Sequence, residues 1–258
     1  MCAARTTTTK ENDIVLTEPT TEKLHALRLS IMADAWKRQQ GDPGSSQLSF
    51  DERFGLLVDA EYRARDDRRL KRLLKDAELR IPTACLEDVE TSSARGLEKP
   101  TVRQLGLCSW IADHHNVLIT GPTGVGKSYL ASALGQTACR RGLRVLYRRL
   151  PRLLEQLSLA RADGSYARLL AKLAKADLLV IDDLGLGAPK ETERHDLLEV
   201  MEDRYGKLAT VITSQLPVPK WHEWIGDATV ADAILDRLVH NAYKIELRGN
   251  SRRKEKAA

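Results

Sequence analysis

The chain has 258 residues, of which 42% are hydrophobic and 30% are charged, and its net charge is +5. This composition provides enough apolar side chains for a folded core and excludes a largely disordered chain. The mild positive charge permits an acidic partner such as nucleic acid but does not require one. No apolar run approaches the roughly 18 residues that a transmembrane helix needs, so we expect no membrane contact.

The four cysteines, Cys2, Cys85, Cys108 and Cys139, lie far apart and form no Cys-x-x-Cys pair. This spacing favours reduced thiols over a zinc site or a disulfide framework. The N-terminal residues lack the apolar segment of a secretory signal. We therefore expect a cytoplasmic protein.

The N-terminal part of the chain has helical patterns without strand patterns. Residues 1–20 are rich in threonine, and we expect them to form a flexible tail. Apolar residues at helical spacing predict a helix from residue 22 to about residue 40. A second helix is predicted to begin at Ser49, with Glu52 completing a capping box, and to end before Pro82.

The composition loosens around residues 91–100, and we place a domain boundary there. The prediction is a small α-helical domain over residues 21–95 and an α/β domain over residues 96–258. In the second domain short apolar runs alternate with helical patterns, which predicts a parallel sheet with flanking helices. The expected strands are 116–120, 144–147, 178–182, 210–213 and 243–247. The expected helices lie near 127–141, 150–161, 165–175, 191–205 and 229–240.

The strongest functional motif is GPTGVGKS at residues 121–128, between a predicted strand and a predicted helix. It matches G-x-x-x-x-G-K-[ST], the phosphate-binding loop of many ATPases and GTPases. Its glycines let backbone N–H groups converge on a phosphate at a helix N-terminus. With ATP as the cofactor, we expect Lys127 to reach the β- and γ-phosphates and Ser128 to bind Mg²⁺. The expected nucleotide-binding residues are Gly121, Pro122, Thr123, Gly124, Val125, Gly126, Lys127, Ser128 and Tyr129.

An acidic pair follows the most hydrophobic predicted strand, in the sequence DLLVIDDLG. Asp182 and Asp183 should emerge at the carboxyl edge of the sheet, where ligands bind to parallel sheets. We expect Asp182 to hold the magnesium ion through water and Asp183 to polarise the attacking water as a base. The alternative is that one aspartate only caps the following turn.

Two further polar residues are candidates for catalysis. Gln215, after the strand at 210–213, is the residue we expect between the acidic pair and the γ-phosphate, with Thr213 as runner-up and a solvent-facing strand end as the alternative. Arg237 lies off the apolar stripe of the helix at 229–240. It suits an arginine finger that is donated to the ATP of a neighbouring subunit. The alternative is an arginine favourably placed at a helix C-terminus.

From about residue 24 to residue 254 the chain resembles the IstB-like transposition helpers, AAA+ ATPases grouped with DnaC-type helicase loaders. The resemblance lies in LRLSIMADAW, LSFDERFGLLVDAEY, NVLITGPTGVGKSYLASALG, TSQLPVPKWHEWIGDATVADAILDRLVHNAYKIELRG and NSRRK. It implies a helical N-terminal domain that joins subunits and an AAA+ domain with Gln215 as sensor 1 and Arg237 as the finger. Too few residues follow Arg237 for the usual helical lid, so a sensor 2 arginine is expected only if SRRKEK supplies it.

The same resemblance implies ATP-dependent self-assembly on double-stranded DNA, bending of that DNA, and its delivery to a DDE-type transposase. Phosphate contacts would need basic residues on one face. The resemblance favours the residues after the second predicted strand, namely Arg148, Arg149, Arg152, Arg161, Arg168 and Lys172. The basic residues from Arg63 to Lys75 are a second candidate, although interleaved acidic residues favour a solvated helix there.

Two other functions remain open from the sequence. A replicative helicase loader would use the same ATP site but would act on single-stranded DNA. A nucleotide-gated adaptor would bind ATP with negligible hydrolysis, and the intact acidic pair at residues 182–183 argues against it.

Overall fold

The computed structural model describes residues 10–251, with side chains from residue 18 onward. The first nine residues of the expected tail and the basic residues after Ser251 lie outside the described part. The chain divides into two compact units, Met1–Arg69 and Leu70–Ala258. This division falls earlier than the boundary expected near residue 95. The reason is that the end of one long helix, with Leu73 and Ala77, belongs to the core of the second unit.

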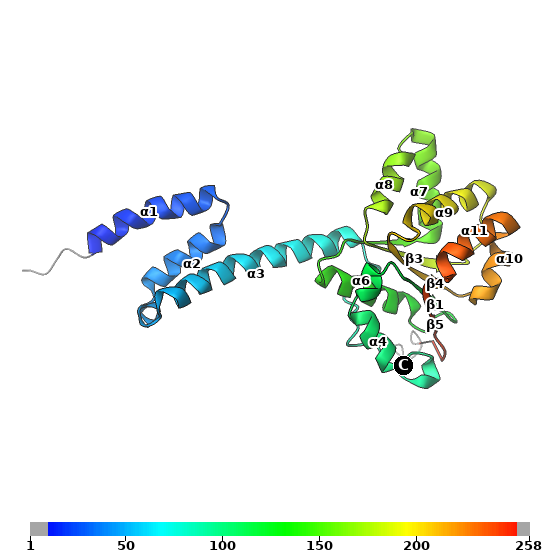
Figure 1. Ribbon diagram of the computed structural model, residues 1–258, viewed down its shortest axis with the longest axis horizontal. Helices are drawn as coiled ribbons and strands as arrows, with labels where there is room; N and C mark the ends of the chain where they lie inside the picture. The colour runs from blue at the N-terminus through cyan, green and yellow to red at the C-terminus, as the bar shows by residue number, and fades with distance from the viewer. Residues whose placement is uncertain (1–9, 252–258) are drawn as a thin grey trace, which may run out of the picture. The chain divides into compact units, whose positions relative to one another are not determined.

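The first unit is helical (Figure 1). Its elements are α1 (Lys10–Ala26), α2 (Ser30–Gly41), the short 3-10 helix η1 (Pro43–Gln47) and the beginning of α3 (Phe50–Ala77). Two expectations differ from this arrangement. Residues 10–20 are helical where a tail was expected, and the helix expected over 22–40 is interrupted at residues 27–29. Arg28 adopts a left-handed conformation with φ 60°, which a continuous α-helix cannot contain.

The start of α2 and the start of α3 are both held by glutamates in the first unit. The backbone N–H groups of Ile31 and Met32 donate to Glu61 Oε2 at 3.0 and 3.1 Å, so this buried carboxylate satisfies the open end of α2. At α3, Ser49 N donates to Glu52 Oε2 at 2.8 Å and Glu52 N donates back to Ser49 Oγ at 3.3 Å. The predicted capping box is therefore confirmed.

The second unit contains a five-stranded parallel sheet in the order β2-β3-β4-β1-β5. The strands are β1 (Asn116–Thr120), β2 (Val145–Arg149), β3 (Leu178–Leu184), β4 (Ala209–Ser214) and β5 (Ala242–Glu246). The helices and 3-10 turns around it are η2 (Ser93–Arg95), α4 (Lys99–Gly106), α5 (Ser109–Ala112), α6 (Lys127–Arg140), α7 (Leu150–Asp163), α8 (Tyr166–Ala174), α9 (Glu191–Arg204), η3 (Val218–Lys220), α10 (Trp221–Ile225) and α11 (Ala228–Val239). The predicted strands and the five predicted helices of this unit are thus all present, with ends that agree within two residues.

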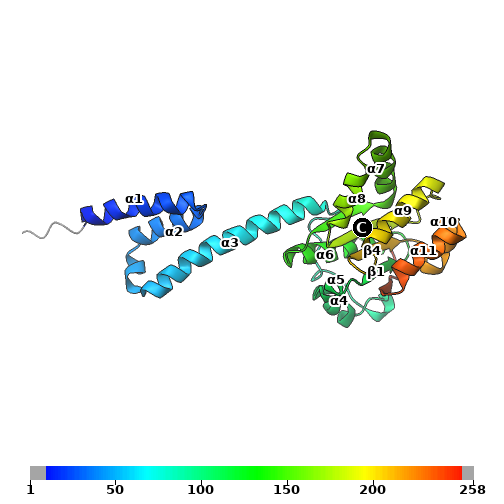
Figure 2. The ribbon, with the colours of Figure 1, turned by 45° about the horizontal axis from the view of Figure 1, so that its top comes forward.

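Helices cover both faces of the sheet, which gives three layers (Figures 1 and 2). Alternate residues of each strand enter two separate apolar cores, as in β3, where Val180 packs with α6 and Leu179 packs with α7 and α9. All five residues of β1 are buried, as a central parallel strand requires. The carboxyl ends of β1, β3 and β4 meet at one edge, and the site described below lies there. No helix within residues 10–251 is both long and apolar enough to cross a bilayer.

Candidate nucleotide-binding site

The loop between β1 and α6 needs glycine at positions where its backbone turns sharply. Gly121 has φ 142°, and a Cβ atom there would lie 2.2 Å from the Leu247 carbonyl oxygen. Gly124 has φ 87°, and a Cβ atom would lie 2.2 Å from Ser251 Oγ. Because α6 begins at Lys127, the free N–H groups of its first turn face this loop. The loop is therefore built as an anion-binding turn at a helix N-terminus.

A cavity of about 710 Å³ opens beside this loop, within the size range of small-molecule sites. Residues 123–129 line it together with parts of the segment 80–97 and with Asp183 and Gln215. Of the expected nucleotide-binding residues, Gly121 and Pro122 do not line the cavity. Their carbonyl oxygens instead accept hydrogen bonds from the Lys127 ammonium group at 2.7 and 2.8 Å.

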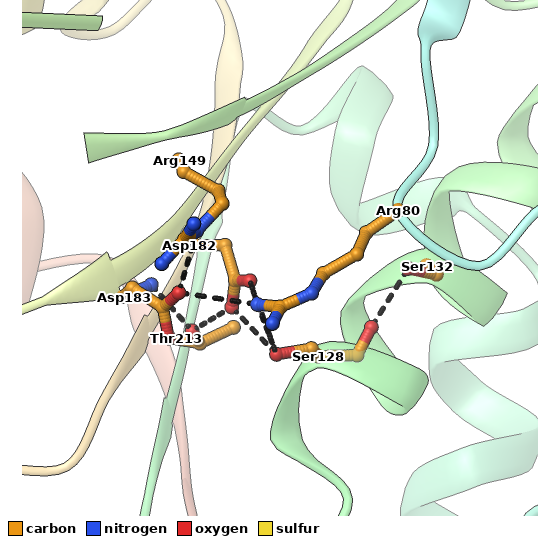
Figure 3. A network of polar contacts seen from close by, with 7 residues as sticks. All are labelled: Arg80, Ser128, Ser132, Arg149, Asp182, Asp183 and Thr213. Carbon is orange, nitrogen blue, oxygen red and sulfur yellow. Dashed lines mark hydrogen bonds and ion pairs between the residues drawn. The ribbon is translucent and has the colours of Figure 1, made fainter. Parts of the chain in front are cut away.

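Asp182 lies at the centre of a polar network at the carboxyl edge of the sheet (Figure 3). Its side chain is fully buried, and Ser128 Oγ donates to its Oδ1 at 2.9 Å. Thr213 Oγ1 makes a very short hydrogen bond to the same oxygen, and Arg80 Nη1 lies 2.6 Å from Oδ2. Burial alone would raise the pKa of the Asp182 carboxyl, but its hydrogen bonds outweigh burial and hold the pKa below its usual value. Asp182 is therefore a carboxylate at neutral pH.

The side chains of Asp182 and Asp183 both reach Arg80, although the two residues are consecutive in β3. Neighbouring side chains of a regular strand point to opposite faces. Here Asp183 has φ 65°, and the register between β3 and β4 shifts between Ile181 and Leu184. As a result Asp183 Oδ2 lies 3.1 Å from Arg80 Nη1 and 2.8 Å from Arg149 Nε.

The oxygen atoms of this network fit a magnesium ion. Ser128 supplies a hydroxyl and Asp182 a carboxylate, and hard oxygen donors of this kind suit Mg²⁺ when phosphate and water complete its shell. The two side chains expected to bind the metal are thus adjacent, within hydrogen-bond distance of each other.

The structure separates the two sensor candidates. Thr213 is buried, and besides bonding to Asp182 its Oγ1 accepts a hydrogen bond from the Asp183 N–H at 3.1 Å. Gln215 contacts the phosphate-binding loop instead, since Thr123 Oγ1 donates to Gln215 Oε1 at 2.7 Å. Thr213 therefore contacts the acidic pair directly, whereas Gln215 lines the cavity and contacts the phosphate-binding loop.

Sequence reasoning missed two arginines at the cavity. Arg80 follows α3 and reaches both aspartates. Arg95 Nη2 donates to the Val125 carbonyl oxygen at 2.8 Å and so supports the phosphate-binding loop from outside. No local pattern marks either residue, because the partners of Arg80 lie 48 to 103 positions away and the loop partner of Arg95 lies 30 positions away.

Arg237 lies away from this cavity. On α11 it forms an ion pair with Glu202 of α9, and its guanidinium lies 5.7 Å from the centre of the Tyr205 ring. Asn116 Nδ2, at the beginning of β1, donates to the Arg237 carbonyl oxygen at 3.1 Å. Arg237 is therefore at the amino edge of the sheet, opposite its own nucleotide cavity.

The six basic residues predicted to contact DNA, of which Arg148 and Arg149 lie at the end of β2, fall into two groups. Three of them form ion pairs within the chain. The buried Arg148 lies 3.2 Å from Glu78, Arg149 pairs with Asp183, and Arg161 pairs with Asp196. The other three, Arg152, Arg168 and Lys172, are exposed on α7 and α8.

The second basic candidate, on α3, is partly neutralised within the first unit. Arg63 pairs with Asp59 at 3.8 Å, and Arg65 with Glu61 at 2.8 Å. Arg68 also lies 3.5 Å from Glu61. These pairs agree with the interpretation of this segment as a solvated helix face.

Comparisons with known proteins agree with this geometry. The family model described as IstB-like ATP binding protein matches residues 22–258. The chain is 51% identical over 240 residues to the protein y4pL of Sinorhizobium fredii, whose name refers to an insertion sequence and to ATP binding. The alignment covers 93% of this chain and 98% of that one. A Pseudomonas fluorescens relative, named for ATP binding in insertion sequence IS1162, is 52% identical over 203 residues, with 79% and 88% covered.

A solved structure of the DnaC helicase loader has the same fold. It aligns with a TM-score of 0.52 and 16% identity over 64% of this chain and 97% of that chain. The P-loop fold, the cavity geometry and the sequence relatives all lead to one assignment. The chain belongs to the family of IstB-like ATP binding proteins.

Proposed function

We propose that this protein is an ATP-hydrolysing helper of transposition that assembles on duplex DNA, bends it and delivers it to a DDE-type transposase. The observation that carries the proposal is the contact of Ser128 with the buried Asp182 carboxylate at the end of the phosphate-binding loop. This arrangement supports a magnesium–nucleotide site in a family whose relatives are named for insertion sequences.

The residues at the cavity suit hydrolysis of a terminal phosphate. Lys127 would leave its two carbonyl acceptors to contact the β- and γ-phosphates, and Ser128 and Asp182 would hold Mg²⁺, the latter through water. The bound metal and triphosphate supply an electrophilic phosphorus and a stable leaving group. Asp183 would accept a proton from the attacking water, and Thr213 fixes its backbone through the hydrogen bond from the Asp183 N–H. Gln215 would approach the γ-phosphate from the loop side.

The position of Arg237 supports a site that two copies of the chain share. Arg237 is not among the residues that line the cavity of its own chain, and its side chain is 23% exposed. When a neighbouring copy docks its cavity against this edge, Arg237 would exchange Glu202 for the neighbour's γ-phosphate. Assembly of the homo-oligomer and ATP binding would then depend on each other.

Duplex DNA would contact the exposed basic residues of α7 and α8. Arg152, Arg168 and Lys172 are exposed, whereas the other three predicted residues already hold acidic partners. Such contacts with phosphates are independent of base sequence, so we expect weak target preference and strong salt dependence. A protein that acts on DNA inside the cell would need a cytoplasmic location, which is the location expected from the cysteine spacing and the N-terminal sequence.

The test combines electron microscopy with ATPase assays. In the presence of ATP and a duplex of roughly fifty base pairs, we expect oligomers with bent DNA and turnover stimulated by duplex DNA. Lys127→Ala on its own should show neither these oligomers nor this turnover. Stronger stimulation by single-stranded DNA would support a helicase loader instead, and ATP binding without turnover on any DNA would support an adaptor.

A further inference from the structure

Arg80 places a positive charge at the meeting point of the oxygen atoms that a magnesium ion needs (Figure 3). Its Nη1 atom lies 2.6 Å from Asp182 Oδ2 and 3.1 Å from Asp183 Oδ2. The same atom lies 3.5 Å from Ser128 Oγ. A metal ion and a guanidinium cannot both occupy this point, because they would overlap and repel each other.

The backbone around Arg80 is fixed, but its side chain is free to turn away. Leu79 is buried in the core against Gly135 of α6, and Glu78 is tied to Arg148 at 3.2 Å. The side chain of Arg80 is 33% exposed and lines the open cavity. Rotation about its side-chain bonds therefore suffices to move the guanidinium out of the network.

We infer that Arg80 is a displaceable counterion for the buried Asp182 carboxylate, which a divalent cation must replace when the site is loaded with nucleotide. The inference rests on the proposed ATPase function and deepens it. A buried carboxylate without a positive partner is costly, so Arg80 keeps the site folded until metal arrives. The exchange also raises the metal concentration at which the site fills, because the metal must break an ion pair before it binds.

The direct test measures metal affinity rather than turnover. Mn²⁺, which prefers the same oxygen ligands as Mg²⁺, is titrated into the protein with saturating AMPPCP and followed by electron paramagnetic resonance. We expect Arg80→Ala to lower the apparent Kd for Mn²⁺ by about tenfold or more, equivalent to about 1.4 kcal/mol. Arg80→Lys, which keeps the charge, should lie between this variant and the wild type.

Arg149→Ala is the matched control. It also removes one positive charge beside Asp183. Although Arg149 pairs with Asp182 along the backbones of β2 and β3, its guanidinium bonds to Asp183 and not to the side chain of Asp182 or Ser128 in the described structure. Since Arg149 is 43% exposed, we expect its removal to change the Kd by less than about threefold. If the two variants changed the Kd for Mn²⁺ equally, only the total positive charge near the site would matter. That result would overturn the inference that the metal displaces Arg80.

Thermal unfolding without nucleotide is the second readout. Arg80→Ala should unfold at a lower temperature than the wild type, and added Mg²⁺ should restore more stability to the variant. A folded variant with unchanged or weaker Mn²⁺ affinity overturns the inference, as does a variant that loses AMPPCP affinity, since Arg80 would then be a nucleotide ligand. A wild-type chain that binds neither Mn²⁺ nor AMPPCP contradicts the proposed function as well.

Discussion

The two edges of the central sheet use their charged residues in different ways. At the carboxyl edge, Asp182 is bound by side chains, namely Ser128, Thr213 and the partly exposed Arg80. At the amino edge, Arg204 is bound mainly by backbone. Its guanidinium is buried and donates to the carbonyl oxygens of Leu173, Ala176 and Ala209 and to Thr210 Oγ1.

This difference separates exchangeable contacts from permanent ones. Side-chain partners such as Arg80 can rotate away and be replaced by a ligand, whereas the carbonyl oxygens around Arg204 belong to the backbone of α8, of β4 and of the segment before β3 and cannot leave without local unfolding. Burial lowers the pKa of Arg204 to about 10, so it stays charged at neutral pH and needs all of its acceptors. We therefore expect substitutions around Asp182 to change function and substitution of the backbone-bound Arg204 to change stability.

The largest expected effect is on catalysis at the carboxyl edge. Asp183→Asn keeps the shape and tolerates the left-handed backbone at φ 65°, but it cannot accept a proton. We expect ATP turnover to fall by about 100-fold or more, with AMPPCP affinity and melting temperature close to wild type. Unchanged turnover would show that Asp183 is not the base and that the acidic pair has only a structural role.

At the amino edge the expected effect is on folding. Arg204→Met fills the space but removes the buried hydrogen bonds to three carbonyl oxygens and to Thr210, so the free energy of unfolding should fall by about 3 kcal/mol or more. Urea denaturation measures this loss. The folded fraction should still bind AMPPCP with wild-type affinity, and a selective loss of nucleotide binding would break the separation of the two edges.

A smaller effect is expected at the beginning of β1. Asn116 Nδ2 donates to the carbonyl oxygens of Arg237 and Leu238, and Thr210 N donates to Asn116 Oδ1 at 2.9 Å. Removing these buried hydrogen bonds in Asn116→Ala should cost about 1–2 kcal/mol of unfolding free energy. Thermal unfolding of both proteins at the same concentration measures this loss. A difference in stability smaller than the experimental error of the wild-type measurement would mean that water replaces the hydrogen bonds of the side chain.

The α/β unit was largely predictable because its signals are local. Strand β3 is an apolar run with Asp182 and Asp183 at its end, and the phosphate-binding loop has its glycines at fixed spacing. The interruption at Arg28 was not predictable, because the apolar spacing continues through it. The contacts of Arg80, Arg95 and Arg204 depend on residues distant in sequence, and no local pattern encodes them.

The choice between Thr213 and Gln215 shows the same limit. Thr213 lies near the end of β4 and Gln215 directly follows it, and which of them faces Asp182 depends on the register of β4 against β3. That register is irregular next to the acidic pair, where Asp183 leaves the regular strand conformation. Residues two positions apart lie on the same face of a regular strand, so strand alternation does not separate Thr213 from Gln215, and sequence alone left both candidates open.

In the proposed assembly, the carboxyl edge of one copy and the amino edge of its neighbour share one ATP site. The most direct test of this sharing is complementation between two inactive variants. Lys127→Ala lacks a functional phosphate-binding loop but keeps Arg237, whereas Arg237→Ala keeps the loop but lacks the finger. Each alone should have negligible ATP turnover on duplex DNA, and an equimolar mixture should recover a substantial part of wild-type turnover at mixed interfaces. No recovery in mixtures that form joint oligomers, or full turnover by Arg237→Ala alone, would contradict a site shared between copies.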